Sequence, residues 1–290
     1  MLTLKAPAKI NWFLNILGKR KDGYHEIQSL IQKITLHDKL TFAPSNDLIL
    51  KTGAPVPVEE NLVYKAAMLL KSRCGIEKGA VIHLDKNIPM GAGLGGGSSD
   101  AAAALLGLNE LWSLDLSLEE LSEIAGQLGS DVPLFLYGPL SFVYGRGEKT
   151  VPRKAEKTLD ILLVKPPFDV STAWVYNNFS MLTKKAEKVN NIEHFIRKIE
   201  RAELKGITGD VSNDLESVTI NSFPVIAGIK EMLRKQGAVF SLMSGSGSTV
   251  FGVFESRKKA REASCAFNEF WTAVVQTTAD SEKVWGVDKR

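Results

Sequence analysis

Several features are scarce in this sequence of 290 residues, and each absence disfavours a class of protein. The two cysteines, Cys74 and Cys265, lie far apart and outside any metal-ligand spacing, which suits a reducing cytoplasm and argues against a disulfide scaffold. No apolar run approaches the roughly 18 residues of a membrane span, and the first residues lack an apolar signal core. We therefore expect a cytoplasmic protein with no membrane partner.

Strong charge of one sign is also missing. The formal net charge is only +3, which permits an anionic ligand but does not require nucleic acid. The basic cluster near the start, Lys19-Arg20-Lys21, ends at Asp22, and this pattern is typical of a solvated turn. A nucleic-acid partner is accordingly not expected, and a small molecule is.

Glycine is concentrated at one place. Residues 89–100, Pro-Met-Gly-Ala-Gly-Leu-Gly-Gly-Gly-Ser-Ser-Asp, hold five glycines, and four alanines, 101–104, follow. Glycine lets the backbone approach an anion closely, and the first turn of a helix offers unpaired N–H groups at the positive end of its dipole. Ser98 and Ser99 can cap that helix or supply hydroxyls to a phosphate or a metal ion. The segment is predicted to be a phosphate-binding loop.

The context of this loop disfavours other interpretations. A Walker A loop is excluded, because no Gly-Lys-Ser or Gly-Lys-Thr occurs in the chain. Residues 91–96 match the dinucleotide fingerprint, but six residues, 85–90, separate the glycines from the apolar run 80–84. A glycine-rich surface turn without a ligand is the remaining alternative, and several adjacent flexible positions at a helix start disfavour it.

Helical and strand patterns alternate in both halves, so we predict an α+β fold with two domains, 1–152 and 158–290. The junction is expected at 151–157, where Pro152 stands among alternating charges. Strands are expected at 2–4, 10–17, 27–36, 39–42, 80–84, 161–164 and 271–277, and on both sides of a glycine turn within 239–254. Helices are expected at 61–72, after the glycine loop, from a capping box at Ser117 to about 128, and at 213–236 and 256–270.

Lys9 and Asp131 indicate a function only when they are considered together with other motifs of the chain. Lys9 in a strand is most often a surface charge, and Asp131 before Val132-Pro133 is most often a turn or helix cap. However, five segments occur in a fixed order: Ala8-Lys9-Ile10-Asn11, Asp22-Gly23-Tyr24-His25-Glu26, the glycine loop, Gly129-Ser130-Asp131-Val132-Pro133 and Met243-Ser244-Gly245-Ser246-Gly247. This series resembles the galactokinase, homoserine kinase, mevalonate kinase and phosphomevalonate kinase (GHMP) superfamily, from about Ala6 to about Phe254.

Within that superfamily, the Asp-Gly-Tyr-His segment beside Ala-Lys-Ile-Asn is similar to the branch whose substrate is a cytidine diphosphate derivative of methylerythritol. The resemblance implies a two-domain small-molecule kinase with its active site in the cleft between domains. It implies that ATP, with Mg2+, phosphorylates a tertiary hydroxyl, with Asp131 as general base and Lys9 as its neighbour. A mevalonate or homoserine kinase remains an alternative, although Tyr24 and His25 argue against it, and a non-catalytic nucleotide-binding protein is more remote.

The resemblance also implies ligand contacts. For ATP these are Asn61, Lys86, Pro89, Gly91, Gly93, Leu94, Gly95, Gly96, Gly97, Ser98 and Ser99, with Ser99 also a candidate magnesium ligand. For the substrate they are Asn11, Tyr24, His25, Asp131, Tyr176 and Gly245, with Tyr24 and Tyr176 on opposite faces of the cytosine. Asn61 is equally well explained as a helix N-cap. Gly145-Arg146-Gly147 is either a hairpin turn or a segment that brings the Arg146 cation to the substrate diphosphate. Whether the protein is a monomer or a homodimer stays open.

Overall fold

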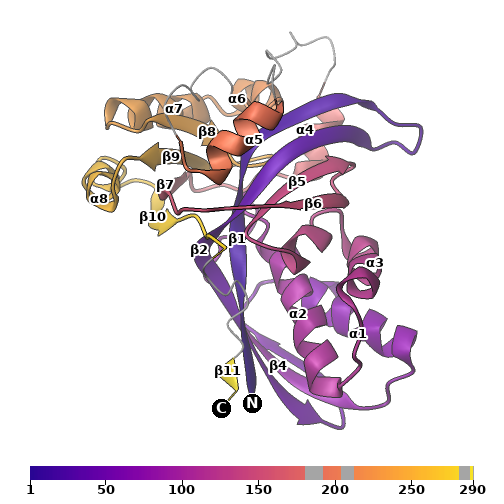
Figure 1. Ribbon diagram of the computed structural model, residues 1–290. Helices are drawn as coiled ribbons and strands as arrows, with labels where there is room; N and C mark the ends of the chain where they lie inside the picture. Colours follow the sequence, from indigo (N-terminus) through magenta and orange to yellow (C-terminus); the bar gives the residue numbers. More distant parts are fainter. Residues whose placement is uncertain (180–191, 204–211, 281–287, 290) are drawn as a thin grey trace.

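The computed structural model describes residues 1–179, 192–203, 212–280 and 288–289, which form two β-sheets with helices packed on them (Figure 1). Within these residues, the first sheet has seven strands. Its main order is β11 (Asp288–Lys289), β1 (Leu2–Lys19), β2 (His25–Ser45), β4 (Gly79–Asp85) and β3 (Leu48–Thr52). In addition, β5 (Leu140–Gly145) pairs with β2, and β6 (Lys149–Arg153) pairs with β5. The second sheet has the order β10 (Trp271–Gln276), β7 (Asp160–Lys165), β9 (Val250–Phe254) and β8 (Phe240–Met243). The predicted α+β class is confirmed.

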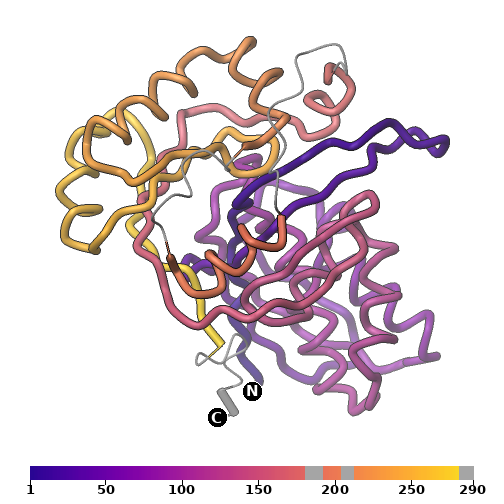
Figure 2. Tube along the Cα trace, turned by 45° about the horizontal axis from the view of Figure 1, so that its top comes forward, coloured from indigo at the N-terminus to yellow at the C-terminus, as the bar shows by residue number. Residues whose placement is uncertain are grey.

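Two long strands, β1 (Leu2–Lys19) and β2 (His25–Ser45), lie at the centre of the first sheet. Each replaces a pair of shorter strands that the sequence predicts. The register between them shifts between Pro7 and Lys9, and this irregularity accommodates a proline without ending the strand. The N-terminal part of β2, from Ile27 to Gln32, pairs with β5, and its C-terminal part, from Lys39 to Ser45, pairs with β4. The tip of the β1–β2 hairpin projects from the molecule (Figures 1 and 2).

The remaining elements of the first half complete this sheet with strands β3 to β6 and pack helices against it. They are β3 (Leu48–Thr52), η1 (Val58–Glu60), α1 (Leu62–Cys74), β4 (Gly79–Asp85), α2 (Gly96–Trp112), α3 (Leu118–Leu128), η2 (Pro133–Leu136), β5 (Leu140–Gly145) and β6 (Lys149–Arg153). Local signals explain the helix ends. Asn61 caps α1 by accepting a bond from Val63 N at 2.9 Å, and Ser117 and Glu120 form the predicted capping box of α3.

The second half builds the smaller sheet and its helices: β7 (Asp160–Lys165), α4 (Thr172–Asn178), α5 (Ile192–Glu200), α6 (Glu216–Ser222), α7 (Val225–Lys235), β8 (Phe240–Met243), β9 (Val250–Phe254), α8 (Arg257–Ser264) and β10 (Trp271–Gln276). The single helix predicted at 213–236 is wrong. It is two helices, because Pro224 has no N–H to continue the hydrogen-bond ladder of α6. The helix predicted at 256–270 ends at Ser264, and tighter turns follow.

The chain changes sheets between β6 and β7, where the sequence places the junction. The division into domains 1–152 and 158–290 stays a prediction. The short strand β11 (Asp288–Lys289) pairs with β1, so the last residues return to the first sheet. Asp288 and Lys289 accordingly lie beside Leu2 and Thr3, at the start of β1 (Figure 1).

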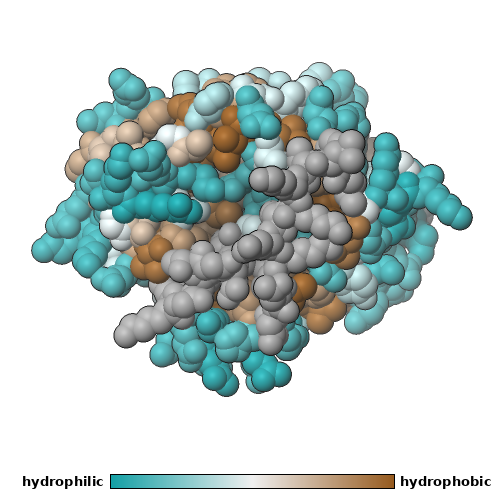
Figure 3. Space-filling view, turned by 90° about the horizontal axis from the view of Figure 1, so that it is seen from above, coloured by the Kyte–Doolittle hydropathy of each residue, from teal (hydrophilic) through white to brown (hydrophobic). Residues whose placement is uncertain are grey.

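Apolar residues gather in three buried clusters, one under α1 and α2, one between β1 and the second sheet, and one under α7 and α8. The second cluster joins the two halves, since Trp12 of β1 packs against Phe240 and Phe251. Seen from above, the described surface is largely hydrophilic with smaller apolar areas (Figure 3). Among the helices of the described residues, none has the length and apolar content needed to cross a membrane.

Candidate active site

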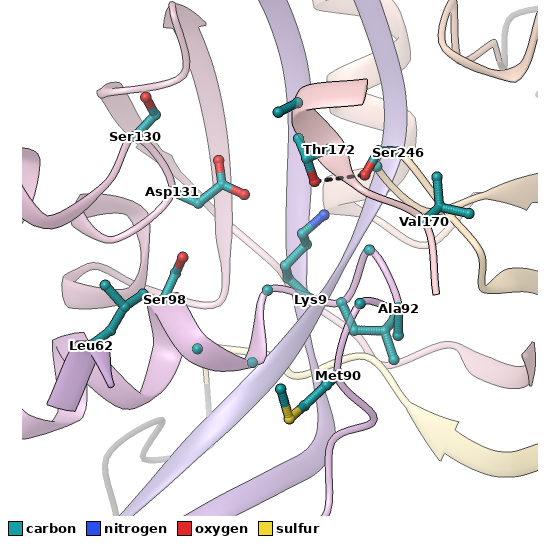
Figure 4. A pocket seen from close by; sticks show the side chains of 18 of the residues that line it. Lys9, Leu62, Met90, Ala92, Ser98, Ser130, Asp131, Val170, Thr172 and Ser246 are labelled. Atoms are coloured by element: carbon teal, nitrogen blue, oxygen red, sulfur yellow. Dashed lines mark hydrogen bonds between the residues drawn. The ribbon is translucent and has the colours of Figure 1, made fainter. Parts of the chain in front are cut away.

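A cavity of about 980 Å3 lies where residues from both halves of the chain meet. Most of the residues that the sequence predicts for the site line it: Lys9, Asn11, Tyr24, His25, Asn61, Lys86, Pro89, Gly91, Gly93, Leu94, Gly95, Gly96, Gly97, Ser98, Asp131, Tyr176 and Gly245. Ser99 is not part of this lining. Figure 4 shows Lys9 and Asp131 extending into the same space from different elements.

The glycine loop is held by its carbonyl groups. Four successive carbonyls each accept a hydrogen bond from outside the loop: Gly91 O from Val170 N (3.3 Å), Ala92 O from Thr249 N (3.2 Å), Gly93 O from Ser244 Oγ (3.0 Å) and Leu94 O from Lys9 N (3.0 Å). Three of these donors belong to the second half of the chain. The loop is therefore fixed from its carbonyl side, mainly by the smaller sheet and its turns.

Backbone conformation explains why this loop needs glycine. Gly93 has a φ of +74°, and a Cβ there would lie 2.1 Å from Ser244 O. Gly95 has a φ of +71° and is the N-cap of α2, where it has no side chain to cap the helix. The first N–H groups of α2 have no intrahelical partner and carry the positive end of its dipole. The loop thus presents a helix start suited to a phosphate.

Substitution of one loop glycine tests this geometry. We expect Gly93→Ala to raise the dissociation constant of ATP more than about tenfold, because a methyl group there displaces the loop from Ser244. The control is Gly126→Ala in α3, where no atom lies within 4 Å of the added Cβ. That change should leave ATP binding unaltered and stabilise the fold by up to about 1 kcal/mol. Isothermal titration with ATP distinguishes the two, and unchanged ATP binding by Gly93→Ala would contradict the phosphate-loop assignment.

Lys9 is held in the cavity by a chain of hydrogen bonds. Its side chain is only 3% exposed, and its ammonium donates to Asn11 Oδ1 at 2.5 Å. The Asn11 amide in turn donates to Ser29 Oγ at 2.8 Å. Burial lowers the pKa of Lys9 from 10.5 to about 8, although the charge of Asp131 acts in the opposite direction. Lys9 is therefore a mostly protonated, fixed cation at neutral pH, and Asn11 orients it.

Asp131 lies in the segment between α3 and η2, whose turn is closed by a bond from Val132 N to Gly129 O at 3.2 Å. Its carboxylate faces the cavity beside the β5–β6 hairpin, where a Cβ on Gly147 would be 3.7 Å from Asp131 Oδ1. The following helix η2 is anchored from β2, because Lys33 donates to Phe135 O (2.9 Å) and Tyr137 O (2.6 Å). Sequence reasoning missed this anchor, since nothing local distinguishes Lys33 from a surface lysine.

Aromatic residues form another wall of the cavity. The rings of His25 and Tyr176 lie 5.4 Å apart, and the guanidinium of Arg146 lies 5.1 Å from the centre of the Tyr24 ring. Tyr176 therefore faces His25 in this structure. Tyr24 is 52% exposed, so its ring remains accessible to a ligand. Burial, and secondarily Lys19, lowers the pKa of His25 below its usual 6.5 and so favours the neutral imidazole, which can both donate and accept a hydrogen bond.

The second glycine turn approaches Lys9 from the smaller sheet. A Cβ on Gly245 would lie 3.0 Å from Lys9 Nζ, and the φ of this glycine is +56°. The turn is fixed by Asn213, whose amide donates to Met243 O (2.9 Å) and Gly245 O (2.7 Å). Ser246 Oγ also bonds to Thr172 Oγ1 at 2.9 Å, the contact drawn in Figure 4. The sequence predicted the glycine turn but not its contact with Asn213, which lies thirty residues before Met243.

At the opposite side of the loop, Asn61 lines the cavity and caps α1 at the same time, so its two predicted roles are compatible. Lys86 lines the cavity but also contacts two buried carboxylates, Asp38 and Asp100. Ser99 Oγ is buried and has no hydrogen-bond partner among the described residues. Among those residues there is also no group of three or more His, Cys, Asp or Glu side chains that could hold a metal ion.

The fold and this site define a GHMP kinase. The family model described as GHMP kinases N terminal domain matches residues 61–139, and that described as GHMP kinases C terminal matches residues 183–273. Three similar proteins narrow the class further.

A protein of Thermodesulfovibrio yellowstonii named 4-diphosphocytidyl-2-C-methyl-D-erythritol kinase is 46% identical, over 98% of this chain and 100% of that protein. One of the same name from Pelotomaculum thermopropionicum is 44% identical, over 92% and 94%. A crystal structure of 4-(cytidine 5'-diphospho)-2C-methyl-D-erythritol kinase is 34% identical with a TM-score of 0.82, covering 96% of this chain and 100% of that one. The chain belongs to the 4-diphosphocytidyl-2-C-methyl-D-erythritol kinase family.

Proposed function

We propose that this chain transfers the γ-phosphate of ATP to the 2-hydroxyl of 4-diphosphocytidyl-2-C-methyl-D-erythritol, giving the 2-phosphate and ADP in non-mevalonate isoprenoid precursor synthesis. The observation that carries the proposal is the shared cavity. It is lined by a phosphate loop, by Lys9 and Asp131, and by the aromatic residues Tyr24 and His25. A kinase for mevalonate or homoserine also needs a phosphate loop and a catalytic pair, but its substrate has no base to stack on the aromatic residues.

Each ligand has a proposed place in this cavity. The ATP phosphates lie on the N–H groups at the start of α2, and the adenine lies near Asn61 and Lys86. The cytosine stacks on Tyr24, a contact worth roughly 1–3 kcal/mol, and His25 bonds its edge. Asn11, Tyr176 and Gly245 complete the substrate side. The compartment we propose is the cytoplasm, in keeping with two free cysteines, Cys74 and Cys265.

Asp131 and Lys9 are the proposed catalytic residues. Phosphoryl transfer passes through a loose transition state, so the proton of the attacking hydroxyl can leave late. Asp131 is accordingly proposed to accept a hydrogen bond from the attacking hydroxyl and to orient this hydroxyl toward the γ-phosphate. The Lys9 ammonium, fixed by Asn11, stabilises negative charge on the attacking oxygen and on the transferred group. Catalysis then depends mainly on positioning and electrostatics.

Magnesium is proposed as the accompanying cation, and the residues present fit a site made largely of ATP oxygens. Mg2+ retains several waters and takes few protein ligands, so it needs no carboxylate cluster. Two hydroxyls are near the phosphate position: Ser98 lines the cavity, and Ser99 Oγ is buried without a partner among the described residues. When bound, the ion neutralises phosphate charge in the transition state. Ser99 as a ligand stays a prediction.

The buried lysine gives a prediction for the pH dependence. Because the pKa of Lys9 is about 8, its ammonium is present below that pH and is lost above it. We expect kcat/KM to fall as pH rises through about 8, since this parameter reports the groups of the free enzyme. Lys9→Arg should be slower but should keep its charge across the range from pH 7 to about 10. An alkaline decline that persists unchanged in Lys9→Arg would assign it to another group.

The test of the function is a comparison of acceptors. Magnesium-dependent ADP release from ATP is measured with the cytidyl substrate, with mevalonate and with homoserine at equal concentrations. Turnover with the cytidyl compound alone supports the proposal. Turnover with mevalonate or homoserine instead would retain the phosphate loop and Asp131 but overturn the substrate. Turnover with none would leave a nucleotide-binding protein without this chemistry.

A further inference from the structure

A buried cluster of three charged side chains lies beside the glycine loop. Lys86, just after β4, contacts Asp38 Oδ2 of β2, and its Nζ lies 2.7 Å from Asp100 Oδ2 of α2. The Asp38 side chain is 0% exposed and that of Asp100 is 4% exposed. None of the three groups acts on the transferred phosphoryl group in the function proposed above, although Lys86 lines the cavity near the proposed adenine position. Buried charges are costly unless paired, so a cluster of this kind needs an explanation.

Asp38 also binds the chain that enters the loop. Its second oxygen, Oδ1, accepts bonds from the backbone N–H groups of Asn87 (2.5 Å) and Ile88 (2.8 Å). Strand β4 ends at Asp85, so these two N–H groups fall outside the sheet ladder and need other partners. One carboxylate thus fixes both the side chain of Lys86 and the backbone that leads to Pro89.

The same cluster reaches the chain that leaves the loop. Asp100 stands near the start of α2, and a Cβ on Gly96 would lie 3.0 Å from Ile88 Cγ2 and 3.3 Å from Lys86 Nζ. The first residues of α2 therefore rest directly on the segment that Asp38 holds. The loop carbonyls are bonded elsewhere, to Val170, Thr249, Ser244 and Lys9, so the cluster supplies the contacts at the two ends.

We propose that Asp38, Lys86 and Asp100 are positioning residues that join the two ends of the glycine loop and thereby set its affinity for the ATP phosphates. The proposal rests on the proposed function only for the identity of the nucleotide. It assigns Lys86 an action through its two carboxylate partners, rather than a separate contact with ATP. Asp100 takes part through Oδ2 alone, since its buried Oδ1 has no hydrogen-bond partner among the described residues. In a low-dielectric interior, loss of one member of such a network leaves its charged partners unpaired and weakens the whole.

The first test is Asp38→Asn, which removes a charge with little change in shape. We expect the KM for ATP to rise about tenfold, the equivalent of losing one charge-assisted hydrogen bond, with kcat and the KM for the cytidyl substrate within about threefold. Arg153→Met is the matched control. Arg153 likewise lies between two carboxylates, Glu193 (2.5 Å) and Glu200 (3.2 Å), but does not line the cavity. This control should lower the melting temperature and leave the KM for ATP unchanged.

A double-mutant cycle separates the proposed action of Lys86 from direct contact with ATP. If Lys86 acts only through the cluster, adding Lys86→Met to Asp38→Asn should weaken ATP binding much less than Lys86→Met does in the wild-type protein, because the network is already broken. Additive losses would show an independent contact and overturn the proposal. If Asp38→Asn does not fold, Asp100→Asn takes its place in the cycle.

Binding of magnesium-ATP is measured by titration without an acceptor, so a wrong acceptor does not affect this result. Unchanged ATP affinity in the aspartate variant would also overturn the proposal.

Discussion

Asp131→Asn is expected to lower kcat by about 1000-fold, within the range that a positioned general base contributes. The amide cannot accept the proton of the attacking hydroxyl, while the nearly identical shape preserves the segment between α3 and η2. ATP binding should stay within about twofold, because the phosphate loop lies on other elements. Turnover is measured by ADP release, and ATP affinity by titration of the same preparation.

The control for Asp131→Asn is Asp47→Asn. Asp47 is exposed and lies outside the cavity lining, so this variant should turn over substrate at the wild-type rate. If Asp131→Asn retains most of its kcat, Asp131 is not the base. If it loses ATP affinity in parallel with kcat, its role is structural, and the separation of phosphate loop and acceptor site proposed here is wrong.

Lys9→Met should lower kcat by about 100-fold or more, comparable with the loss of one oxyanion-stabilising donor. Methionine fills a similar buried volume but carries no charge for the transferring phosphoryl group. The control is Lys230→Met, which removes a partly buried ammonium 2.6 Å from Glu216 and outside the cavity lining. That variant should lose stability and keep its turnover. Equal losses of kcat in both variants would indicate a general effect of deleting a buried lysine.

Local signals in the sequence predicted much of the fold and the site. Short local sequence patterns predict the glycine loop, the N-cap at Asn61 and the capping box at Ser117, and each occurs where expected. The order of motifs then brought Lys9 and Asp131 into one hypothesis, and both line the same cavity. Periodicity was weaker at strand ends, where a register shift joined segments expected to be separate.

The groups that fix the site could not be predicted in the same way. Asp38, Lys33 and Asn213 each act over a long stretch of sequence, on backbone or side chains that only the fold brings near. Their residue types are ordinary for a strand or a loop, so no local pattern marks them. What distinguishes them is burial combined with charge or with a full set of hydrogen bonds, and both are properties of tertiary structure.

The edges of each sheet show the same limit. Strand β3 and the β5–β6 hairpin were not assigned from the sequence, although the glycines around Arg146 suggested a turn. These strands are short, and β3 and β6 are each paired on one side only, so their patterns are weak. The hairpin matters for function, because it brings Arg146 over Tyr24 and Gly147 against Asp131.

A crystal structure of the ternary complex with magnesium, a non-hydrolysable ATP analogue and the cytidyl substrate tests the central claim most directly. The account predicts the β- and γ-phosphates on the N-terminal amides of α2, the cytosine on Tyr24 and His25, and the 2-hydroxyl within about 2.6–3.2 Å of an Asp131 oxygen. A cytosine bound elsewhere, or a hydroxyl far from Asp131 with the phosphates in place, would contradict it.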